Sequence, residues 1–441
     1  MTTFLTKPTF EAIMAAKSIA HLFPKIQKKN ILVAGDLILD RYTFGTCRRI
    51  SPEAPVPVIS VTGEEERPGG AGNVAVNLLS LGQNPIIFGR VGTDAAGSAL
   101  LQALQAEGIS TGDIFQEKGF QTPLKVRLIA ASQQVTRIDY ETFRPISQEA
   151  EKILCERIEP LLEQIDLVAI SDYAKGFLTE NILSRLIHEA RSRNIPVISD
   201  PKGIELAKYA GSTILKPNLQ EAYAAAPSCS ELADVARQIF QQAPVDILMV
   251  TRSEAGISLF YPDGTNEHHP VCPRQVKDVT GAGDTVLAVL SAAVANGIAV
   301  ADATELANIG GQIAIERLGC ARVSLPDLAR AYAGGHSDNK IFDEAHIPVL
   351  EQALQPGTYS LFTLDANVCL TSKLLREVRG QARDAKKEIV VALLGPVVDE
   401  ELVHTLASIK EVAYLLLLSS NCDNVLTRLV PHETVSFGAQ A

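Results

Sequence analysis

The chain has 441 residues, of which 46% are hydrophobic and 21% are charged, and its formal net charge is -11 at neutral pH. This composition is typical of a folded globular protein with two or three domains, and it excludes a disordered chain. The negative charge excludes a general nucleic-acid surface, which needs a basic face to neutralise phosphates.

The first 29 residues and the cysteines indicate where the protein works. The N-terminal segment has a helical apolar spacing interrupted by charges and prolines, which predicts a helical extension and not a signal peptide. Seven scattered cysteines without a C-x-x-C pair indicate reduced thiols in a cytoplasmic protein. The longest uncharged segment, residues 285–301, contains Asn296 and Gly297 and is short for a membrane span, so it predicts a buried core helix and no membrane partner.

Short runs rich in Ile and Val alternate with helical stretches from residue 30 onward. Runs that are apolar on both faces predict parallel strands covered by helices on both sides. The expected strands are NILVAGD, NPIIFGRVG, DLVAISD, IPVISD, STILKPN and DILMVTR. The ligand crevice of an open α/β sheet lies beyond the carboxyl ends of its strands. The polar residues that end these runs are therefore expected at one rim: Asp36, Asp172, Asp200, Lys216, Asn218 and Arg252.

Two other segments, VPVISVTGEE and LKVRLIAASQQVTRIDYE, alternate apolar and polar residues. This pattern predicts antiparallel strands with one covered face and one solvated face, and we interpret them as a small β lid over the crevice. The second segment carries Lys125, Arg127 and Arg137. These basic side chains either face a ligand or are solvated charges of the lid.

A glycine-rich stretch, DVTGAGDTVLAVL, opens an apolar helix at residues 278–290. Gly281, Ala282 and Gly283 can turn tightly and expose backbone N–H groups at the positive end of the helix dipole. The same dipole is expected to keep Asp284 ionised, so that it can accept a hydroxyl proton. The stretch predicts a phosphoryl-transfer site, although a glycine-rich turn with a capping Asp explains this motif when it is considered alone.

A second glycine-rich helix start, GGAGNVAVNLLSLG, occupies residues 69–82. Gly70, Gly72 and Ala75 fit a loose dinucleotide-binding pattern, but GEEERP precedes them where that pattern requires a buried strand. The sequence has no G-x-x-x-x-G-K-[ST] motif, which excludes a P-loop enzyme. The two glycine-rich stretches therefore need another explanation.

Together the two stretches resemble the signature motifs of the ribokinase-like (PfkB) carbohydrate kinases. Residues 30–330 are most similar to the kinase half of the bifunctional heptose 7-phosphate kinases and heptose 1-phosphate adenylyltransferases, through GDLILDRYTFG, RRISPEAPVPVISV, ERPGGAGNVAVNLLSLG, SDYAKG, DPKG, KPNLQE and TRSEAG. The resemblance implies a three-layer α/β/α domain with a mostly parallel sheet and a small β lid. It also implies phosphorylation by ATP of the anomeric C1 hydroxyl of D-glycero-D-manno-heptose 7-phosphate, in ADP-heptose and lipopolysaccharide core synthesis. A kinase for another sugar or sugar phosphate, or a nucleotide-binding regulator without catalysis, are the alternatives.

The resemblance implies roles for the residues that match the family's motifs. Asp284 is expected to be the catalytic base, and the amides of Gly281, Ala282 and Gly283 are expected to stabilise the transferring phosphoryl group. ATP and its Mg²⁺, which has no direct protein ligand, are expected at Asn218, Glu221, Thr251, Arg252, Gly256 and Asn308, with Asn218 and Glu221 on one helix face. The sugar phosphate is expected at Asp40, Gly70, Asn73, Lys125, Arg127 and Lys175. A monovalent cation such as K⁺, which the family often binds, would lie near Asp278 and Thr280.

A polar, glycine-containing segment follows Leu328 and predicts a linker over residues 331–345. Residues 346–441 show a second, smaller Rossmann-like α/β pattern, with strands expected at TYSLFTLD, EIVVALLG and VAYLLLLSS. In the bifunctional relatives this region carries an H-x-G-H motif that binds the nucleotide's phosphates. Thr371, Lys373 and Leu374 stand at the matching positions, and they cannot supply imidazolium donors.

The resemblance therefore implies a degenerate nucleotidyltransferase-like domain without adenylyltransferase activity. A separate adenylyltransferase and a phosphatase would then complete the pathway, and the relatives imply a homodimer. The sequence HHPVC places His268, His269 and Cys272 together, but no second cluster completes four metal ligands. We expect a loop or strand edge there.

Overall fold

The computed structural model describes residues 4–5, 19–130, 133–271, 276–317, 319–334, 340–365, 376, 380, 388–395, 398–418 and 428–437. Its internal contacts divide the chain into a large unit, Gln27–Ser324, and a small unit, Met1–Ile26 with Leu325–Ala441. Helix α10 (Leu325–Gly334) begins the second part of the small unit, so the expected domain end at residue 330 falls inside this helix. Each unit is described by itself.

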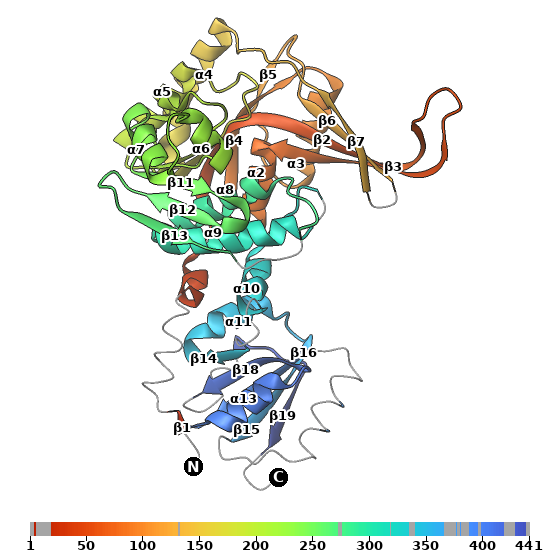
Figure 1. Cartoon of the computed structure of the whole chain (residues 1–441), viewed down its shortest axis with the longest axis vertical. Helices are drawn as coiled ribbons and strands as arrows, with labels where there is room; N and C mark the ends of the chain where they lie inside the picture. Colours follow the sequence, from red (N-terminus) through yellow and green to blue (C-terminus); the bar gives the residue numbers. More distant parts are fainter. Residues whose placement is uncertain are drawn as a thin grey trace. The chain divides into compact units, whose positions relative to one another are not determined.

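A mostly parallel sheet forms the centre of the large unit, as the apolar runs predicted. Its strands are β2 (Asn30–Ile50), β4 (Asn84–Gly92), β5 (Phe115–Glu117), β8 (Leu167–Ser171), β9 (Val197–Asp200), β10 (Ile214–Leu215), β11 (Ile247–Thr251), β12 (Ile257–Phe260) and β13 (Asn266–His269). Their order is β13-β12-β11-β10-β9-β8-β2-β4-β5 (Figure 1). Neighbours from β11 to β5 are parallel, and β12 and β13 add an antiparallel edge.

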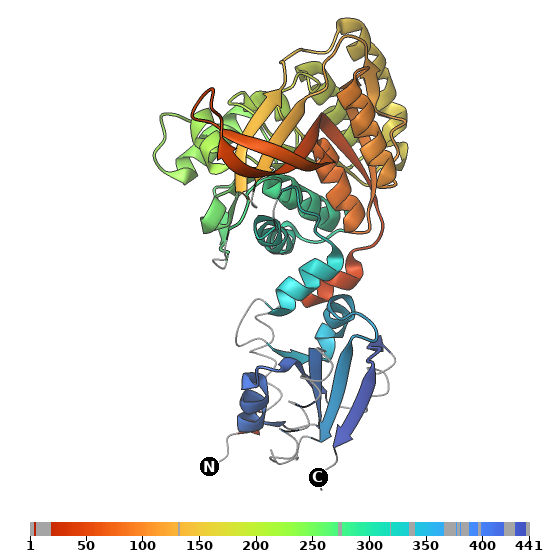
Figure 2. The same cartoon turned by 90° about the vertical axis from the view of Figure 1, so that its right-hand side faces the viewer.

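Helices cover both faces of this sheet. On one face lie α4 (Gln148–Leu161), α5 (Glu180–Ser192), α6 (Leu219–Ala225) and α7 (Leu232–Gln242). The opposite face is covered by α2 (Ala71–Ser80), α8 (Ala282–Ala295) and α9 (Val300–Ile315), with α8 and α9 side by side (Figure 2), and α3 (Ala95–Ala106) packs on β2, β3 and β4. The segment predicted as a buried core helix thus forms α8 and the start of α9. Within the described part of the chain, no helix is long and apolar enough to cross a membrane.

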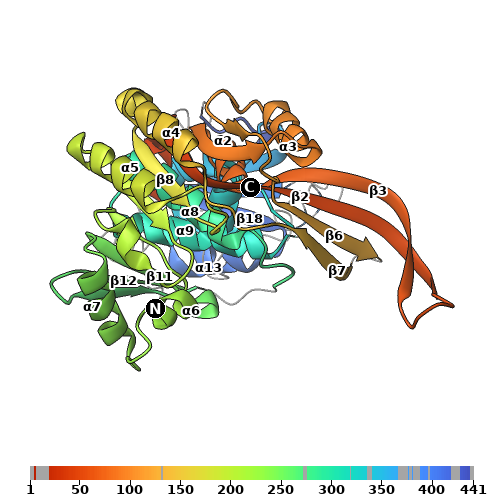
Figure 3. The ribbon, with the colours of Figure 1, turned by 90° about the horizontal axis from the view of Figure 1, so that it is seen from above.

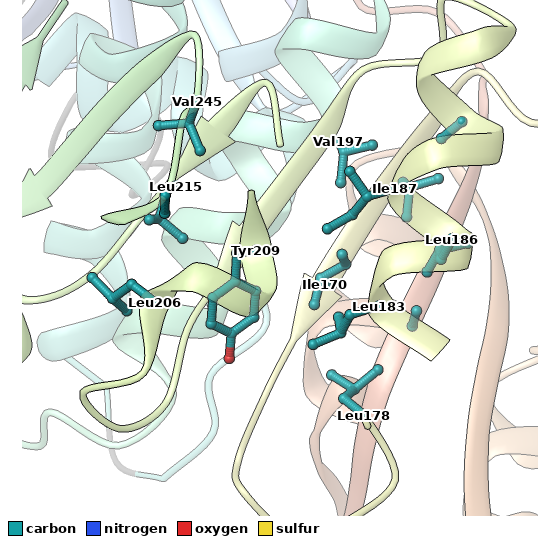
Figure 4. Close-up of a cluster of buried hydrophobic side chains, with 14 of the residues drawn as sticks. Ile170, Leu178, Leu183, Leu186, Ile187, Val197, Leu206, Tyr209, Leu215 and Val245 are labelled. Atoms are coloured by element: carbon teal, nitrogen blue, oxygen red, sulfur yellow. The ribbon is translucent and has the colours of Figure 1, made fainter. Parts of the chain in front are cut away.

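The core under α5 shows why these layers hold together. Thr179 caps α5 by accepting a hydrogen bond from the N–H of Ile182, and apolar residues then recur on one face of the helix. Leu183 and Ile187 face the strand residues Ile170 and Val197 (Figure 4). Burying each such side chain contributes about 1.5–3 kcal/mol, so the sheet is a rigid support for the residues at its rim.

The lid grows out of the central sheet. Residues 30–36 of β2 pair with β4 and β8, but from Leu37 onward β2 pairs with β3 (Pro57–Gly70) and β6 (Leu124–Ala130), so the same strand continues into the lid (Figure 3). The segment at residues 124–141 forms β6 and β7 (Gln133–Tyr140), which pair antiparallel as expected for the lid. The other expected lid segment lies in β3 and pairs with the second half of β2. That half of β2 was not among the strands predicted for the lid.

The small unit is a parallel α/β domain, as its apolar runs predicted. Its sheet has the order β14-β18-β16-β15-β19 within the described residues. The strands are β14 (Ile341–Asp343), β15 (Tyr359–Asp365), β16 (Glu388–Leu394), β18 (Val412–Leu418) and β19 (Glu433–Phe437), and the helices after α10 are α11 (Ile347–Ala353) and α13 (Glu400–Ser408). Thr371, Lys373 and Leu374 lie outside the described residues.

The N-terminal segment belongs to the small unit. Strand β1 (Phe4–Leu5) pairs antiparallel with β17 (Val398–Asp399). The 3-10 helix η1 (Ala20–Lys25) packs against α11, and the ring of Phe23 contacts that of Tyr332. The expected helical extension over residues 1–29 is therefore wrong for residues 4–5, which form β1, and for residues 26–29, which are not helical, while residues 1–3 and 6–18 lie outside the described residues.

Gly35 provides a test of how closely β2 and β8 approach. A Cβ atom at this position would lie 2.2 Å from the carbonyl oxygen of Ser171, its partner on β8. We expect Gly35→Ala to lower the free energy of unfolding by about 1–3 kcal/mol or more, measured by urea denaturation, because the strands must separate. Gly63→Ala on β3 is the control, since no atom lies within 4 Å of its Cβ position. Equal losses in both variants would contradict this account.

Candidate functional site

The carboxyl ends of the parallel strands bring charged groups together at one rim. Nζ of Lys216 lies 2.9 Å from Oδ2 of Asp200, and Nζ of Lys208 lies 2.7 Å from Oδ2 of Asp172. Asp36 is buried at the point where β2 leaves the sheet, and burial together with the charge of Asp172 raises its pKa to about 6. The strand ends therefore bring charged groups to one rim, as predicted, and Asp200 and Asp172 are paired there with lysines.

Helix α8 begins at this rim with a glycine that no other residue can replace easily. Gly281 caps the helix at a φ of 76°, and a Cβ there would lie 2.7 Å from Nδ2 of Asn73. The first N–H groups of the 14-residue helix have no intrahelical partner, so they favour an anion. A Cβ atom at Gly283 would lie 4.0 Å from Oδ2 of Asp200, so the space around this glycine is open. The geometry suits the anion hole that was predicted for this stretch.

The carboxylate of Asp284 joins the two glycine-rich motifs. Its Oδ2 accepts a hydrogen bond of 2.8 Å from Nδ2 of Asn73, which lies on α2. Its Oδ1 accepts a hydrogen bond of 2.7 Å from the hydroxyl of Tyr173, in the loop after β8. The side chain is buried. The motifs indicated Asn73 and Asp284 as site residues but not Tyr173.

The protonation of Asp284 differs from the prediction. Burial raises its pKa to about 7, and the hydrogen bonds from Asn73 and Tyr173 offset only part of that rise. The helix dipole stabilises a charge by about 0.3–1 kcal/mol at an exposed site, which is too little to keep a buried carboxylate fully ionised. A carboxyl group that titrates near neutral pH is suited to act as a general base.

Asp40 and Arg127 form a buried ion pair where the lid meets the sheet. Nη1 of Arg127 bonds to Oδ1 of Asp40, and both side chains are at most 6% exposed. Sγ of Cys320 lies 3.4 Å from Oδ2 of Asp40. The guanidinium groups of Arg67 and Arg127 both lie over the ring of Tyr42, 5.0 and 5.3 Å from its centre. The structure therefore excludes the solvated-charge alternative for Arg127.

The other basic residues of the lid region differ in exposure. Nζ of Lys175 pairs with Oε1 of Glu141 at 2.8 Å, and Nζ of Lys125 lies 5.9 Å from the ring centre of Tyr173. Lys125 is thus near the residue that binds Asp284. Arg137 is half-exposed and pairs with Asp139 on its own strand. It fits the description of a solvated lid charge.

Asn218 and Glu221 form a capping box at the start of α6. Oδ1 of Asn218 accepts the N–H of Glu221, and Oε2 of Glu221 accepts the N–H of Asn218, at 2.9 and 3.0 Å. Asn218 therefore precedes the helix and does not lie on its face, which corrects the expected geometry; the N-x-x-E spacing could have indicated this. Nζ of Lys202 forms an ion pair with Oε1 of Glu221 at 2.7 Å. The backbone of Asn218 forms a β-bridge with Thr251.

The loop after β11 forms a cradle beside these residues. Gly256 has a φ of 80°, and a Cβ there would lie 2.1 Å from the carbonyl oxygen of His269. The same oxygen accepts a hydrogen bond from Nδ2 of Asn308 on α9. Nε of Arg252 is buried without a hydrogen-bond partner in the described structure. A buried guanidinium N–H needs an acceptor, so this cradle fits the phosphates of a nucleotide.

Hydrogen bonds to the carboxylate of Asp278 hold the loop before α8 in place. Its Oδ1 accepts the N–H and the hydroxyl of Thr280, and its Oδ2 accepts the N–H of Gly319. Although burial raises the pKa of Asp278, these hydrogen bonds outweigh it and lower the pKa. The cation suggested for this loop stays a prediction.

The remaining sequence-based candidates divide as follows. Gly70, at a φ of 58°, begins α2, where its backbone approaches Asp36. Nδ1 of His268 contacts the hydroxyl of Ser258 at 2.8 Å on the antiparallel edge of the sheet. Cys272 lies outside the described residues. Among those that are described, no three His, Cys, Asp or Glu side chains are placed to hold a metal ion.

Comparison with known proteins relates the large unit to sugar kinases. The model of the pfkB family of carbohydrate kinases matches residues 28–328. The bifunctional protein HldE of Trichlorobacter lovleyi is 38% identical over 445 residues, which cover 96% of this chain and 91% of the relative.

Two solved structures share the fold. Phosphofructokinase-2 from Escherichia coli in complex with potassium has a TM-score of 0.58 and 20% identity, and the match covers 70% of this chain and 98% of that chain. Arabidopsis thaliana ribokinase complexed with ribose and ATP has a TM-score of 0.51 and 19% identity, and the match covers 68% and 96%. The ribokinase-like fold implied by the motifs is thereby confirmed.

The buried pair of Arg127 and Asp40 gives a stability prediction. Arg127→Gln should lower the free energy of unfolding by about 3–5 kcal/mol, because it leaves the buried carboxylate of Asp40 without its cation. Arg137→Gln is a matched control, since Arg137 faces Arg127 on the paired strand but is exposed, and it should cost about 0–1 kcal/mol. Urea denaturation measures both. A loss below about 1 kcal/mol for Arg127→Gln would contradict the buried pair.

Proposed function

The chain belongs to the pfkB family of carbohydrate kinases, phosphotransferases with an alcohol group as acceptor, and we propose that its acceptor is D-glycero-D-manno-heptose 7-phosphate. The product would be the 1,7-bisphosphate, formed at the anomeric C1 hydroxyl. Such a product suits the synthesis of ADP-heptose for the lipopolysaccharide core. The proposal has two parts, the chemistry of the site and the identity of the acceptor.

The contact between Asn73 and Asp284 carries the chemical part of the proposal. It joins the start of α2 to the start of α8, so that both glycine-rich motifs contribute to one site. That site combines a helix N-terminus, which favours phosphate, with a carboxyl group whose pKa of about 7 lets it accept a proton. Phosphoryl transfer needs these two elements close together.

The reaction follows from this arrangement. Asp284 accepts the proton of the C1 hydroxyl as the hydroxyl oxygen bonds to the γ-phosphorus of ATP, and the bond from that phosphorus to ADP breaks. The amides of residues 281–283 stabilise the charge on the transferring group. Arg252 would hold ATP phosphates. Asn218 and Glu221 would hold the Mg²⁺ of ATP through water, and that ion would supply neutralisation of phosphate charge.

Two observations support a heptose phosphate as acceptor. The motifs quoted above resemble the kinase half of the bifunctional heptose enzymes, and similarity to the HldE of Trichlorobacter lovleyi extends over 96% of this chain. Basic side chains near the site, Lys125, Arg127 and Lys175, would supply charge for an acceptor that already carries a phosphate, which for Arg127 requires Asp40 to share its guanidinium. For Lys175 this requires Glu141 to release it.

We propose in addition that the chain lacks adenylyltransferase activity. Thr371 and Leu374 replace the two histidines expected from the resemblance. Neither a hydroxyl nor an alkyl group can donate two charged hydrogen bonds to a triphosphate. The small unit would then serve another purpose, and a separate enzyme would transfer the adenylyl group.

The purified chain should convert heptose 7-phosphate and ATP to the bisphosphate and ADP, measured by a coupled ADP assay. The same heptose without its phosphate should react poorly, because the basic groups then lack their partner. With heptose 1-phosphate and ATP we expect no pyrophosphate above background. Pyrophosphate release would contradict the loss of adenylyl transfer, and turnover of another sugar phosphate in preference to the heptose would contradict the proposed acceptor.

Asp284→Asn tests the catalytic base. The amide keeps the size of the side chain but cannot accept the hydroxyl proton, so kcat should fall by about 10²- to 10⁴-fold or more while affinity for an ATP analogue and Tm change little. Asp302→Asn is the control, since Asp302 lies in the first turn of α9 and should leave kcat unchanged. If Asp284→Asn kept more than about a tenth of the wild-type kcat, Asp284 would be only a residue of the helix start.

A further inference from the structure

Two side chains donate hydrogen bonds to Asp284, and to one of them, Tyr173, neither the motifs nor the proposed reaction assigns a role. Its hydroxyl donates to Oδ1 of Asp284 at 2.7 Å, while Asn73 occupies Oδ2. The sequence SDYAKG drew attention to Lys175 in the same loop. The structure instead places Tyr173 on the reacting carboxylate.

The loop that carries Tyr173 is held from two sides. Oδ2 of Asp36 accepts the N–H groups of Tyr173 and Lys175, both at 3.0 Å. From the other side, the buried guanidinium of Arg90 donates to the carbonyl oxygen of Lys175 at 3.0 Å and pairs with Glu117. The backbone of the loop is thus fixed against the sheet, and so is the position of its tyrosine.

The loop also contains an unusual backbone conformation. Ala174 has a φ of 54°, which costs energy for a residue with a side chain. Oδ1 of Asp172 accepts the N–H of Ala174 at 2.7 Å and so stabilises the turn. Such conformations persist where the surrounding structure fixes them, and they cluster at functional sites. Here the strained residue is adjacent to Tyr173.

Several charged groups act on Asp284 from the elements around it. Burial favours the protonated carboxyl, and the charge of Asp200 on β9 adds to this effect. Lys216, after β10, and the hydrogen bonds from Asn73 and Tyr173 favour the carboxylate. Sγ of Cys320 contacts Oδ2 of Asp40 at 3.4 Å. Nζ of Lys125 on β6 lies 5.9 Å from the ring centre of Tyr173.

We propose that Tyr173 is a positioning residue of the kinase site, whose hydroxyl holds Oδ1 of Asp284 and stabilises the carboxylate as proton acceptor. The inference rests on the proposed role of Asp284 as base. Burial keeps the Tyr173 phenol protonated by raising its pKa, so the hydroxyl remains a donor. Asn73 and Tyr173 together fix both oxygens, which orients the carboxylate before the substrate binds.

A purely structural role for Tyr173 predicts a different result for the loss of its hydroxyl. In that case loss of the hydroxyl would lower stability or activity equally at every pH. Tyr209 supplies the comparison, because its hydroxyl donates to Oδ2 of Asp172 at 2.5 Å in the same rim without touching Asp284. Tyr173→Phe and Tyr209→Phe thus remove the same kind of bond from two different carboxylates.

The test uses two independent measurements on the full chain, made below the Tm of the least stable variant. Infrared pH-difference spectra of the free protein follow the carbonyl stretch of the protonated Asp284 carboxyl, identified by its loss in Asp284→Asn. The second measurement is kcat/KM for the sugar phosphate between about pH 5 and about pH 9, where a general base of this kind titrates.

Tyr173→Phe should move the infrared midpoint of Asp284 upward by roughly one pH unit, because a hydrogen bond to the charged form is lost. Since the base works as the carboxylate, the acid limb of kcat/KM should move by the same amount. Activity then falls about tenfold below the midpoint and recovers at high pH, while KM for ATP stays unchanged. Tyr209→Phe should leave the midpoint in place.

An unchanged infrared midpoint in Tyr173→Phe, or the same shift in Tyr209→Phe, would overturn the inference. A loss of activity that is uniform in pH would do the same. Failure of the proposed acceptor can be told apart from failure of this inference. In the first case the wild-type protein would not phosphorylate heptose 7-phosphate, and the infrared midpoint would still decide the role of Tyr173.

Discussion

The carboxylates buried along the rim of the parallel sheet constrain the rest of the large unit. A buried charge is costly unless a donor or a cation compensates it, and the partners come from segments far apart in the sequence. Asp40 needs Arg127 from the lid, Asp172 needs Lys208, and Asp284 takes one donor from α2 and another from the loop after β8. Satisfying these groups therefore fixes how the lid, the helices and the loops meet.

The same constraint prepares the site for its chemistry. For the proposed role of Asp284 as base, Asn73 and Tyr173 already hold its carboxylate in place, and a fixed polar environment is a major source of catalytic power. The overall charge of -11 does not oppose the proposed phosphate sites, since the start of α8 and the guanidinium of Arg252 would act locally. The rim and the cradle in the loop after β11 are both supported by the central sheet of the large unit.

Strand β2 shows where sequence reasoning stops. Its first residues are apolar on both faces, as in a central strand, and this part was predicted. Its second half, from Leu37 onward, pairs with β3 and β6. No local pattern says that a strand leaves one sheet and enters another, because the choice depends on which partner strands are available. The pairing of β6 with β7 was predictable because the two strands follow each other closely in the chain.

The sequence by itself determined the parallel sheet, the rim at its strand ends, the glycine-rich start of α8 and the pairing of motifs typical of sugar kinases. These depend on periodicity, turn chemistry and residues near one another in the chain. Only the tertiary structure decided that Tyr173 reaches Asp284, that Arg127 is buried against Asp40, and that burial raises the pKa of Asp284. Burial and long-range pairing are properties of the packed chain, so a local pattern cannot contain them.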